Sequence, residues 1–383
     1  MKQERGAGRP QQMQTIKSSM SNEIDSGTVR SAAAGAPHRA ALPRYDWRQS
    51  YDWNYEHAPA PPVIEEPPVA GGWDFCGLSV GSPLGIAAGP LLNGRWILYY
   101  AALGFDVLTY KTVRSRFRAC YPMPNLQPVT SEAIHRSDAV LPARIDMNGS
   151  WAVSFGMPSK APAVWRADVE ATRRALPPGK ILSVSVVATP EPDWTRDELA
   201  EDFARCAKWA ADSGADSVEA NFSCPNVSSA DGQIYQRPEI AAFVAAKLRE
   251  TVGRRPLLLK IGHVADEAQA TEFCRAVAPH ADALVMVNCI SAAVADLGGR
   301  PMFEAQKRGI AGGAIREAAL DQVRLFSRVI RQERLPLRLV GVGGIATAEH
   351  VRECIRAGSH AVQLATAAML DPTIGFKIRA ELQ

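Results

Sequence analysis

From about residue 73 onward, short runs of apolar and β-branched residues alternate with longer stretches in which apolar positions recur at helical spacing. The eight runs lie at residues 83–90, 105–113, 181–187, 217–223, 257–262, 283–288, 337–345 and 361–367. Continuous apolar runs are typical of parallel strands that are buried on both faces. Eight strand–helix units in roughly 300 residues fit a closed barrel better than an open doubly wound sheet. We therefore predict an α/β fold of the (β/α)₈ TIM-barrel type.

The segment 195–214 illustrates how the helical stretches begin and end. Thr195 and Glu198 have the spacing of a capping box, in which each side chain accepts a hydrogen bond from the other residue's backbone N–H. Gly214 supplies a typical C-terminal stop. The pattern predicts a helix between these signals.

One connection is too long for a single helix. Residues 114–180 separate the second run from the third, and they hold "PMPNLQPV" and "MNGSW" before a helical pattern near 163–176. We expect an excursion, inserted after the second strand, that covers one mouth of the barrel.

The N-terminal part differs from the rest of the chain. Residues 1–44 are rich in Gln, Ser, Ala, Gly and Arg without periodicity, so we expect a disordered tail. Residues 45–72 begin with a dense group of aromatic side chains and continue into a proline-rich stretch. We expect this arm to pack against the body or against a second subunit, because free linkers rarely carry so many aromatics. The barrel domain is assigned to 73–383.

The composition excludes several classes of protein. The chain is 46% hydrophobic and 22% charged, has a net charge of +3 and contains no Lys/Arg run, which does not favour a nucleic-acid-binding surface. The seven cysteines are odd in number and form no C-x-x-C pair, so a disulfide framework or a zinc ribbon is not expected. No apolar run approaches the roughly 18 residues of a membrane span, and the histidines form no metal-binding cluster. We expect a cytoplasmic protein without metal.

Two lysines occur inside apolar runs, at the carboxyl ends where such barrels carry their functional residues. They are Lys111 in "VLTYKTV" and Lys260 in "LLLKIG". A lysine in a buried strand is costly unless an anion or an electron-rich ligand faces it. The pair therefore predicts a binding site for such a ligand.

Glycines at the last strand ends indicate a phosphate site. Gly343 and Gly344 form a turn that leads into a helical pattern, and such a turn exposes backbone N–H groups. Barrels often bind phosphate after strands seven and eight, and Ala365 and Thr366 end the eighth run. Gly312 belongs to a further glycine cluster, "RGIAGGAI".

The stretch "SVEANFSCPNVSS" (217–229) brings polar chemistry to the end of the fourth strand. Asn221 and Asn226 flank Cys224. An amide donates and accepts at once, which suits the amides of a ring. A cysteine beside cationic groups can act as a general acid or base, because these groups lower its pKa.

Together these motifs resemble the class 1 dihydroorotate dehydrogenases. "ANFSCPNV" is similar to their active-site loop, and "GIAAGP", "YKTV", "LLKI", "VNCIS", "VGVGGI" and "VQLATA" match their other strand ends in order. The similarity covers roughly residues 73 to 375.

The resemblance implies an FMN-dependent oxidoreductase that acts on a CH–CH bond of a dihydroorotate-like or dihydropyrimidine-like ring. Cys224 would take a proton from the ring while hydride passes to flavin N5, Lys260 would face the N1/O2 end of the flavin, and Lys111 would lie beside flavin and substrate. The other cofactor-binding residues implied are Ala88, Gly89, Thr112, Gly312, Gly343, Gly344, Ala365 and Thr366. The substrate-binding residues implied are Asn221, Asn226, Asn288, Cys289, Phe155, Gly156 and Met157. A homodimer is also implied.

Two positions depart from the family pattern. Val153 replaces an asparagine that holds the pyrimidine, and Cys289 follows Asn288 where the family has Ser or Thr. Each lost hydrogen-bonding partner costs about 1–3 kcal/mol. Dihydroorotate and another cyclic amide from a specific pathway both remain open as substrates, and the electron acceptor is open as well.

Two alternatives come from other classes of protein. A flavin-free, phosphate-binding aldolase or isomerase would use Lys260 as a Schiff-base amine, but it has no need of the Cys-Pro-Asn loop. A non-catalytic scaffold would gain nothing from two buried lysines.

Overall fold

The computed structural model describes residues 42–130, 132–135, 140–223 and 230–383. Its centre is a closed barrel of parallel strands in the order β10-β11-β14-β15-β3-β4-β8-β9. The barrel strands are β3 (Leu84–Ile86), β4 (Val107–Val113), β8 (Ile181–Val186), β9 (Ser217–Asn221), β10 (Leu257–Lys260), β11 (Ala283–Met286), β14 (Arg338–Val342) and β15 (Ala361–Leu364). Each lies inside one of the eight predicted runs, so the predicted TIM barrel is confirmed.

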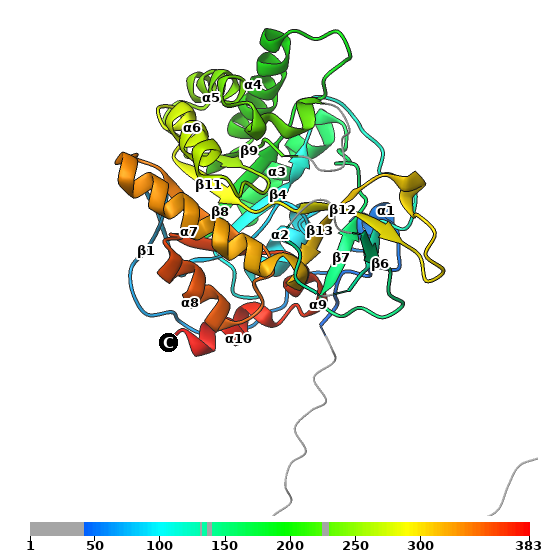
Figure 1. The fold of residues 1–383 in the computed structure, drawn as a ribbon. Coiled ribbons are helices and arrows are strands. Elements are labelled where there is room, and N and C mark those ends of the chain that lie inside the picture. Colours follow the sequence, from blue (N-terminus) through cyan, green and yellow to red (C-terminus); the bar gives the residue numbers. More distant parts are fainter. Residues whose placement is uncertain (1–41, 131, 136–139, 224–229) are drawn as a thin grey trace, which may run out of the picture. The chain divides into compact units, whose positions relative to one another are not determined.

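Helices surround the barrel (Figure 1). They are α2 (Gly94–Ala101), α3 (Pro162–Ala175), α4 (Arg196–Asp212), α5 (Pro238–Val252), α6 (Glu267–Val277), α7 (Arg316–Glu333), α8 (Ala348–Ala357), α9 (Thr366–Leu370) and α10 (Ile374–Glu381). Short 3₁₀ helices span Ala230–Gln236, Phe303–Ala305 and Gly313–Ile315. The predicted capping box of α4 is present, since the Thr195 hydroxyl accepts from Glu198 N and the Glu198 carboxylate accepts from Thr195 N.

A second sheet is built from two excursions. Its strands follow the order β5-β7-β13-β12-β6. They are β5 (Leu126–Pro128), β6 (Val140–Pro142), β7 (Ser150–Val153), β12 (Ile290–Ala295) and β13 (Arg308–Gly312). The first three strands come from the predicted excursion after β4, and the other two come from an excursion after β11 that the sequence pattern did not predict. Because both excursions leave the carboxyl ends of barrel strands, the sheet borders that mouth of the barrel (Figure 1).

The segment before the barrel forms one short helix, α1 (Tyr51–Glu56), and a hairpin of β1 (Trp73–Phe75) and β2 (Leu78–Val80). Tyr45 and Tyr51 are buried in the main hydrophobic core. The indole N–H of Trp96 on α2 donates to the carbonyl of Asn54 at 2.9 Å. The arm therefore packs against the body of the same chain.

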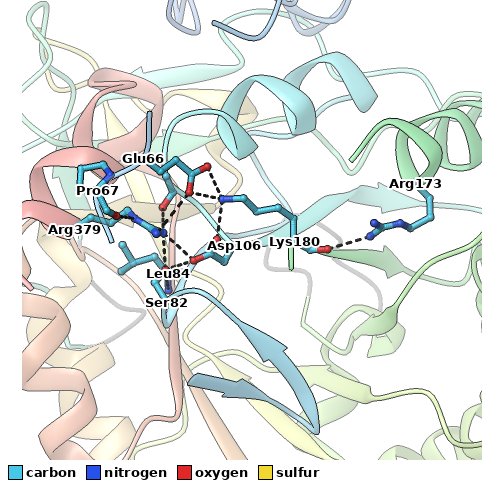
Figure 2. Close-up of polar contacts among 9 residues, drawn as sticks. Glu66, Pro67, Ser82, Leu84, Asp106, Arg173, Lys180 and Arg379 are labelled. Carbon is cyan, nitrogen blue, oxygen red and sulfur yellow. Dashed lines mark hydrogen bonds and ion pairs between the residues drawn. The ribbon is translucent and has the colours of Figure 1, made fainter. Parts of the chain in front are cut away.

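A cluster of buried charges joins the amino end of the barrel to the arm and to α10 (Figure 2). Asp106 precedes β4 and accepts from Lys180 Nζ at 2.8 Å and from Arg379 Nη1 at 2.9 Å. Lys180 also lies 2.6 Å from Glu66 of the arm. Arg379 belongs to α10, and the Ser82 hydroxyl donates a hydrogen bond to Asp106. This cluster lies at the face of the barrel that usually serves stability.

Within the described part of the chain, no helix combines the length and the apolar character of a membrane span.

Candidate active site

The carboxyl ends of the barrel strands and the second sheet border a pocket with about 790 Å³ of empty space, partly open to solvent, which we call the ring cavity. It is lined by Ala87, Ala88, Gly89, Pro90, Lys111, Thr112, Leu126, Trp151, Val153, Phe155, Met157, Asn221, Ser223, Lys260, Asn288, Cys289, Ala311, Val342, Ala365, Thr366 and Met369. A mostly apolar cavity with a few convergent polar groups is the usual form of a cofactor or substrate site.

The two predicted lysines line this cavity from separate strands. Lys111 on β4 and Lys260 on β10 are each only 5% exposed. The Lys111 ammonium lies 5.8 Å from the centre of the Phe155 ring. The Lys260 ammonium lies 3.9 Å from a carboxylate oxygen of Glu219, which is itself fully buried. The cavity therefore presents two ammonium groups that bulk water screens weakly.

Two asparagine side chains meet at the ends of β9 and β11. The Asn288 amide donates to the Ser223 carbonyl at 2.7 Å and to the Ser223 hydroxyl at 3.0 Å. The Asn221 carbonyl oxygen accepts from Ser223 N at 3.2 Å and from the Asn288 amide at 3.3 Å. These bonds fix both side chains, so the cavity holds oriented donors and acceptors for a polar ring.

A second cavity of about 870 Å³, the glycine cavity, adjoins the ring cavity and shares Asn288, Ala311, Val342, Ala365 and Thr366 with it. Gly312, Gly343 and Gly344 line it. Gly343 and Gly344 have φ values of +124° and +67°, in the region that favours glycine. A Cβ atom at Gly344 would lie 2.6 Å from the Arg316 Cβ and 2.9 Å from the Gly312 carbonyl oxygen. Glycine is therefore required at this turn, whose backbone is partly exposed.

An unpartnered hydroxyl lies where the two cavities meet. Thr366 is buried, and its Oγ1 has no hydrogen-bond partner among the described residues. Because buried polar atoms are almost always satisfied, this hydroxyl indicates a place for a polar ligand.

The structure brings most of the predicted site residues to these two cavities. The ring cavity takes Ala88, Gly89, Lys111, Thr112, Phe155, Met157, Asn221, Lys260, Asn288 and Cys289, the glycine cavity takes Gly312, Gly343 and Gly344, and both take Ala365 and Thr366. Gly156 lines neither cavity, since the ring of Tyr121 packs against its Cα. Cys224 and Asn226 lie outside the described residues.

Other lining residues were missed from the sequence. Leu126, Trp151 and Met369 form part of the apolar wall of the ring cavity. They come from the second sheet and from α9. No local sequence pattern indicates that these elements reach the barrel mouth. Val153 and Cys289, which depart from the family pattern, also line this cavity.

Two basic side chains that the sequence pattern did not single out line the glycine cavity. Arg316 begins α7 and forms an ion pair of 2.6 Å with Glu353. His350 accepts from Ala346 N at 3.2 Å, and burial followed by the nearby Arg316 cation lowers its pKa. Their position next to a glycine turn would have been the signal.

Three cysteines have the buried helical positions of structural residues. Cys206, Cys274 and Cys354 lie in α4, α6 and α8. Burial raises the pKa of Cys206 above its usual range, that of Cys274 to about 12 and that of Cys354 to about 11. Such thiols stay protonated and unreactive at neutral pH. Among the described residues no group of His, Cys, Asp or Glu side chains could hold a metal ion.

Comparison with known proteins identifies the family of this chain. The family model for dihydroorotate dehydrogenase matches residues 142–383. A dihydroorotate dehydrogenase of Dictyostelium discoideum is 33% identical over 79% of this chain and 86% of its own length. The chain belongs to the dihydroorotate dehydrogenase family. It is therefore a flavin-dependent oxidoreductase, and the flavin-free barrel is not favoured.

Two further relatives of this dihydroorotate dehydrogenase family member are informative. The catalytic subunit of dihydroorotate dehydrogenase B (NAD(+)) from Desulforudis audaxviator is 29% identical over 81% of this chain and 90% of its own length. The crystal structure of the Eimeria tenella dihydroorotate dehydrogenase in complex with ferulenol has a TM-score of 0.65 at 17% identity, and it covers 81% of this chain and 83% of that chain. At this identity the likeness shows the shared fold.

Proposed function

We propose that the protein is an FMN-dependent dehydrogenase that oxidises the CH–CH bond of dihydroorotate. The observation that carries the proposal is the junction of two cavities, one with two buried lysines and fixed asparagine amides, the other with a glycine turn. Family membership supports the same reaction.

The residues present fit FMN. The Gly343–Gly344 turn suits a phosphate, because it combines exposed backbone with a conformation that no other residue adopts easily. Thr366, which lines both cavities, would offer FMN an unpartnered hydroxyl. Ala88 and Gly89 line the ring cavity, where a small residue and a glycine allow close approach to the backbone. When bound, FMN supplies the hydride acceptor.

The substrate would occupy the part of the ring cavity nearest to the two asparagines. Asn221 and Asn288 are oriented by Ser223 and would bind the amides of the ring. Lys111 would offset the negative charge of a carboxylate substrate. Phe155 and Met157 would close the apolar side and exclude water.

We assign the proton acceptor to Cys224, on the family motif. It lies outside the described residues, but it directly follows Ser223, which lines the ring cavity and bonds to Asn288. Cationic groups such as the two lysines of the ring cavity would stabilise a thiolate. Assembly as a homodimer is proposed on the family resemblance alone.

Val153 changes how the ring can be held. It occupies β7, on the wall of the ring cavity, where the family carries an amide. An apolar side chain leaves one polar edge of the substrate without a partner, at a cost of about 1–3 kcal/mol. We expect a high KM for dihydroorotate relative to family members that keep the asparagine.

The visible absorption spectrum of the purified protein tests the proposed function. We expect bound flavin that is extracted as FMN, and bleaching of its colour when dihydroorotate is added without oxygen. A flavin that does not bleach would reject dihydroorotate as substrate and leave the cofactor assignment intact. A colourless protein that takes up no added FMN would reject both.

A glycine substitution tests the phosphate site. Gly344→Ala forces a Cβ against Arg316 and the Gly312 carbonyl oxygen. A misfit of about 1–3 kcal/mol corresponds to about 5- to 150-fold weaker FMN binding, measured by fluorescence titration of the apoprotein. Gly253→Ala is the matched control, because Gly253 has a similar φ of +63° and a Cβ there meets nothing within 4 Å. Equal losses in both variants would contradict the assignment.

A further inference from the structure

One buried carboxyl group beside the ring cavity has no role in the proposed reaction. Glu219 is the central residue of β9 and is 0% exposed. It lies two residues before Asn221, so both side chains point to the same face of the strand, into the barrel. Neither of its carboxylate oxygens makes a hydrogen bond of good geometry with another described residue, although the Ser185 hydroxyl and the Gln363 amide lie near enough to lower its pKa. Burying a carboxyl group in this way is costly, so another interaction has to offset the cost.

The charged group that faces Glu219 is Lys260. Its ammonium nitrogen lies 3.9 Å from Glu219 Oε1, and both side chains are shielded from water. In the strand register, Asn221 of β9 is opposite Lys260 of β10, which places Glu219 one layer deeper in the barrel. The carboxyl group therefore lies below the ammonium, on the side away from the ring cavity.

The other polar groups described near Glu219, those of Ser185 and Gln363, are uncharged. Burial raises the pKa of the Glu219 carboxyl group, while Lys260 and, to a smaller extent, the Ser185 hydroxyl and the Gln363 amide oppose this. Gln363 of β15 is itself held by the hydroxyl of Thr109 at 3.0 Å. Lys260 is thus the partner through which a charge on Glu219 acts on the ring cavity.

We propose that Glu219 is a positioning residue that serves as the counter-ion of Lys260 and sets the positive charge that this lysine presents to the bound flavin. The inference rests on the proposed function, because it takes Lys260 to face the flavin. Charge next to the flavin ring tunes its electronics. An ionised Glu219 attenuates the lysine charge, and a neutral one leaves this charge uncompensated.

The affinity of the holoprotein for sulfite measures this charge without turnover. Sulfite adds reversibly to protein-bound flavin and carries negative charge into the ring, so a more positive site binds it more tightly. Glu219→Gln keeps the shape and removes the charge. We expect its sulfite dissociation constant at neutral pH to be about tenfold lower than that of the wild type. A change of this size lies within the range of interaction energies between residues of one salt-bridge network.

The pH profile distinguishes this role from a structural one. As the pH falls through the raised pKa of Glu219, the wild type loses the same charge that Glu219→Gln lacks at every pH. The ratio of the two sulfite dissociation constants is therefore expected to approach one at low pH and to grow as the pH rises. Comparing the two proteins at each pH cancels the ionisation of sulfite itself.

Ser217→Ala is the matched control. Ser217 lies on the same strand, is fully buried, and its hydroxyl has no hydrogen-bond partner among the described residues. Its loss disturbs the barrel interior without changing charge, and the sulfite affinity should stay at the wild-type value. Should Glu219→Gln fail to fold, Glu219→Met removes the same charge with a side chain of similar size, and the same direction is expected.

The outcomes separate the two proposals. If the wild-type protein binds FMN but Glu219→Gln has the wild-type sulfite affinity at all pH values, the proposed role of Glu219 is wrong. The cofactor assignment would then remain. A wild-type protein that binds no flavin would overturn both.

Discussion

Lys260→Met is expected to lower the rate of anaerobic flavin reduction by dihydroorotate by about 10²–10³-fold, the typical cost of removing one preorganised group that faces developing charge. Lys260 lines the ring cavity, is only 5% exposed, and is held by a buried carboxylate. Because little water reaches this position, solvent cannot replace the missing charge. Methionine keeps a flexible, unbranched side chain of similar length, so the packing around the stem is largely retained. Stopped-flow absorbance of the flavin measures the rate directly.

The control for this experiment is a lysine far from the cavity. Lys247 is a partly exposed residue on α5 that does not line the ring cavity, and its Nζ lies 3.9 Å from Glu201 Oε1. Lys247→Met should reduce its flavin at the wild-type rate. Both variants have to be compared at equal FMN content, since Lys260 also belongs to the proposed cofactor site. If Lys260→Met reduced its flavin as fast as Lys247→Met, Lys260 would not face the charge that develops in the reaction.

The barrel could be predicted from the sequence because its strands obey a local rule. A parallel strand covered on both faces has to be apolar along its whole length, and the eight runs show this within six to nine residues each. The second sheet has no comparable signal. Its strand β12 pairs with β6 and β13, and β13 pairs with β7, so most of its order comes from contacts between segments far apart in the chain.

The candidate site followed from topology in the same way. Once a barrel is assumed, all strand ends converge on one mouth, and this alone places Lys111, Lys260 and Asn288 together. Trp151 could not be found by this reasoning, because it reaches the cavity from the second sheet. Glu219 could have been found. A carboxylate inside an apolar run is as unusual as the two lysines, and it lies on the same face as Asn221.

Asp106→Ala is expected to have the largest effect on stability, lowering the free energy of unfolding by about 3–5 kcal/mol. The reason is the charge cluster of Figure 2, in which Asp106 accepts from both Lys180 and Arg379. All three side chains are at least nine-tenths buried. Removing the carboxylate leaves two buried cations with Glu66 as their remaining acidic partner, and a buried charge without its counter-ion costs more than the pair contributed.

Urea unfolding measures this loss as a lower midpoint at an unchanged slope. Glu170→Ala is the matched control, because it breaks the exposed ion pair with Arg174 on α3, whose 2.6 Å is no longer than the 2.8 and 2.9 Å of the two Asp106 pairs. That change should cost at most about 0.5 kcal/mol. The difference between the stability losses of the two variants therefore reports the burial of the ion pair and not its length. Since Glu66 and Pro67 of the arm bind Lys180 and Arg379, Asp106→Ala should also expose the arm to proteases before the barrel unfolds. Equal stability losses in the two variants, with an arm that stays protected, would show that the cluster does not hold the arm in place.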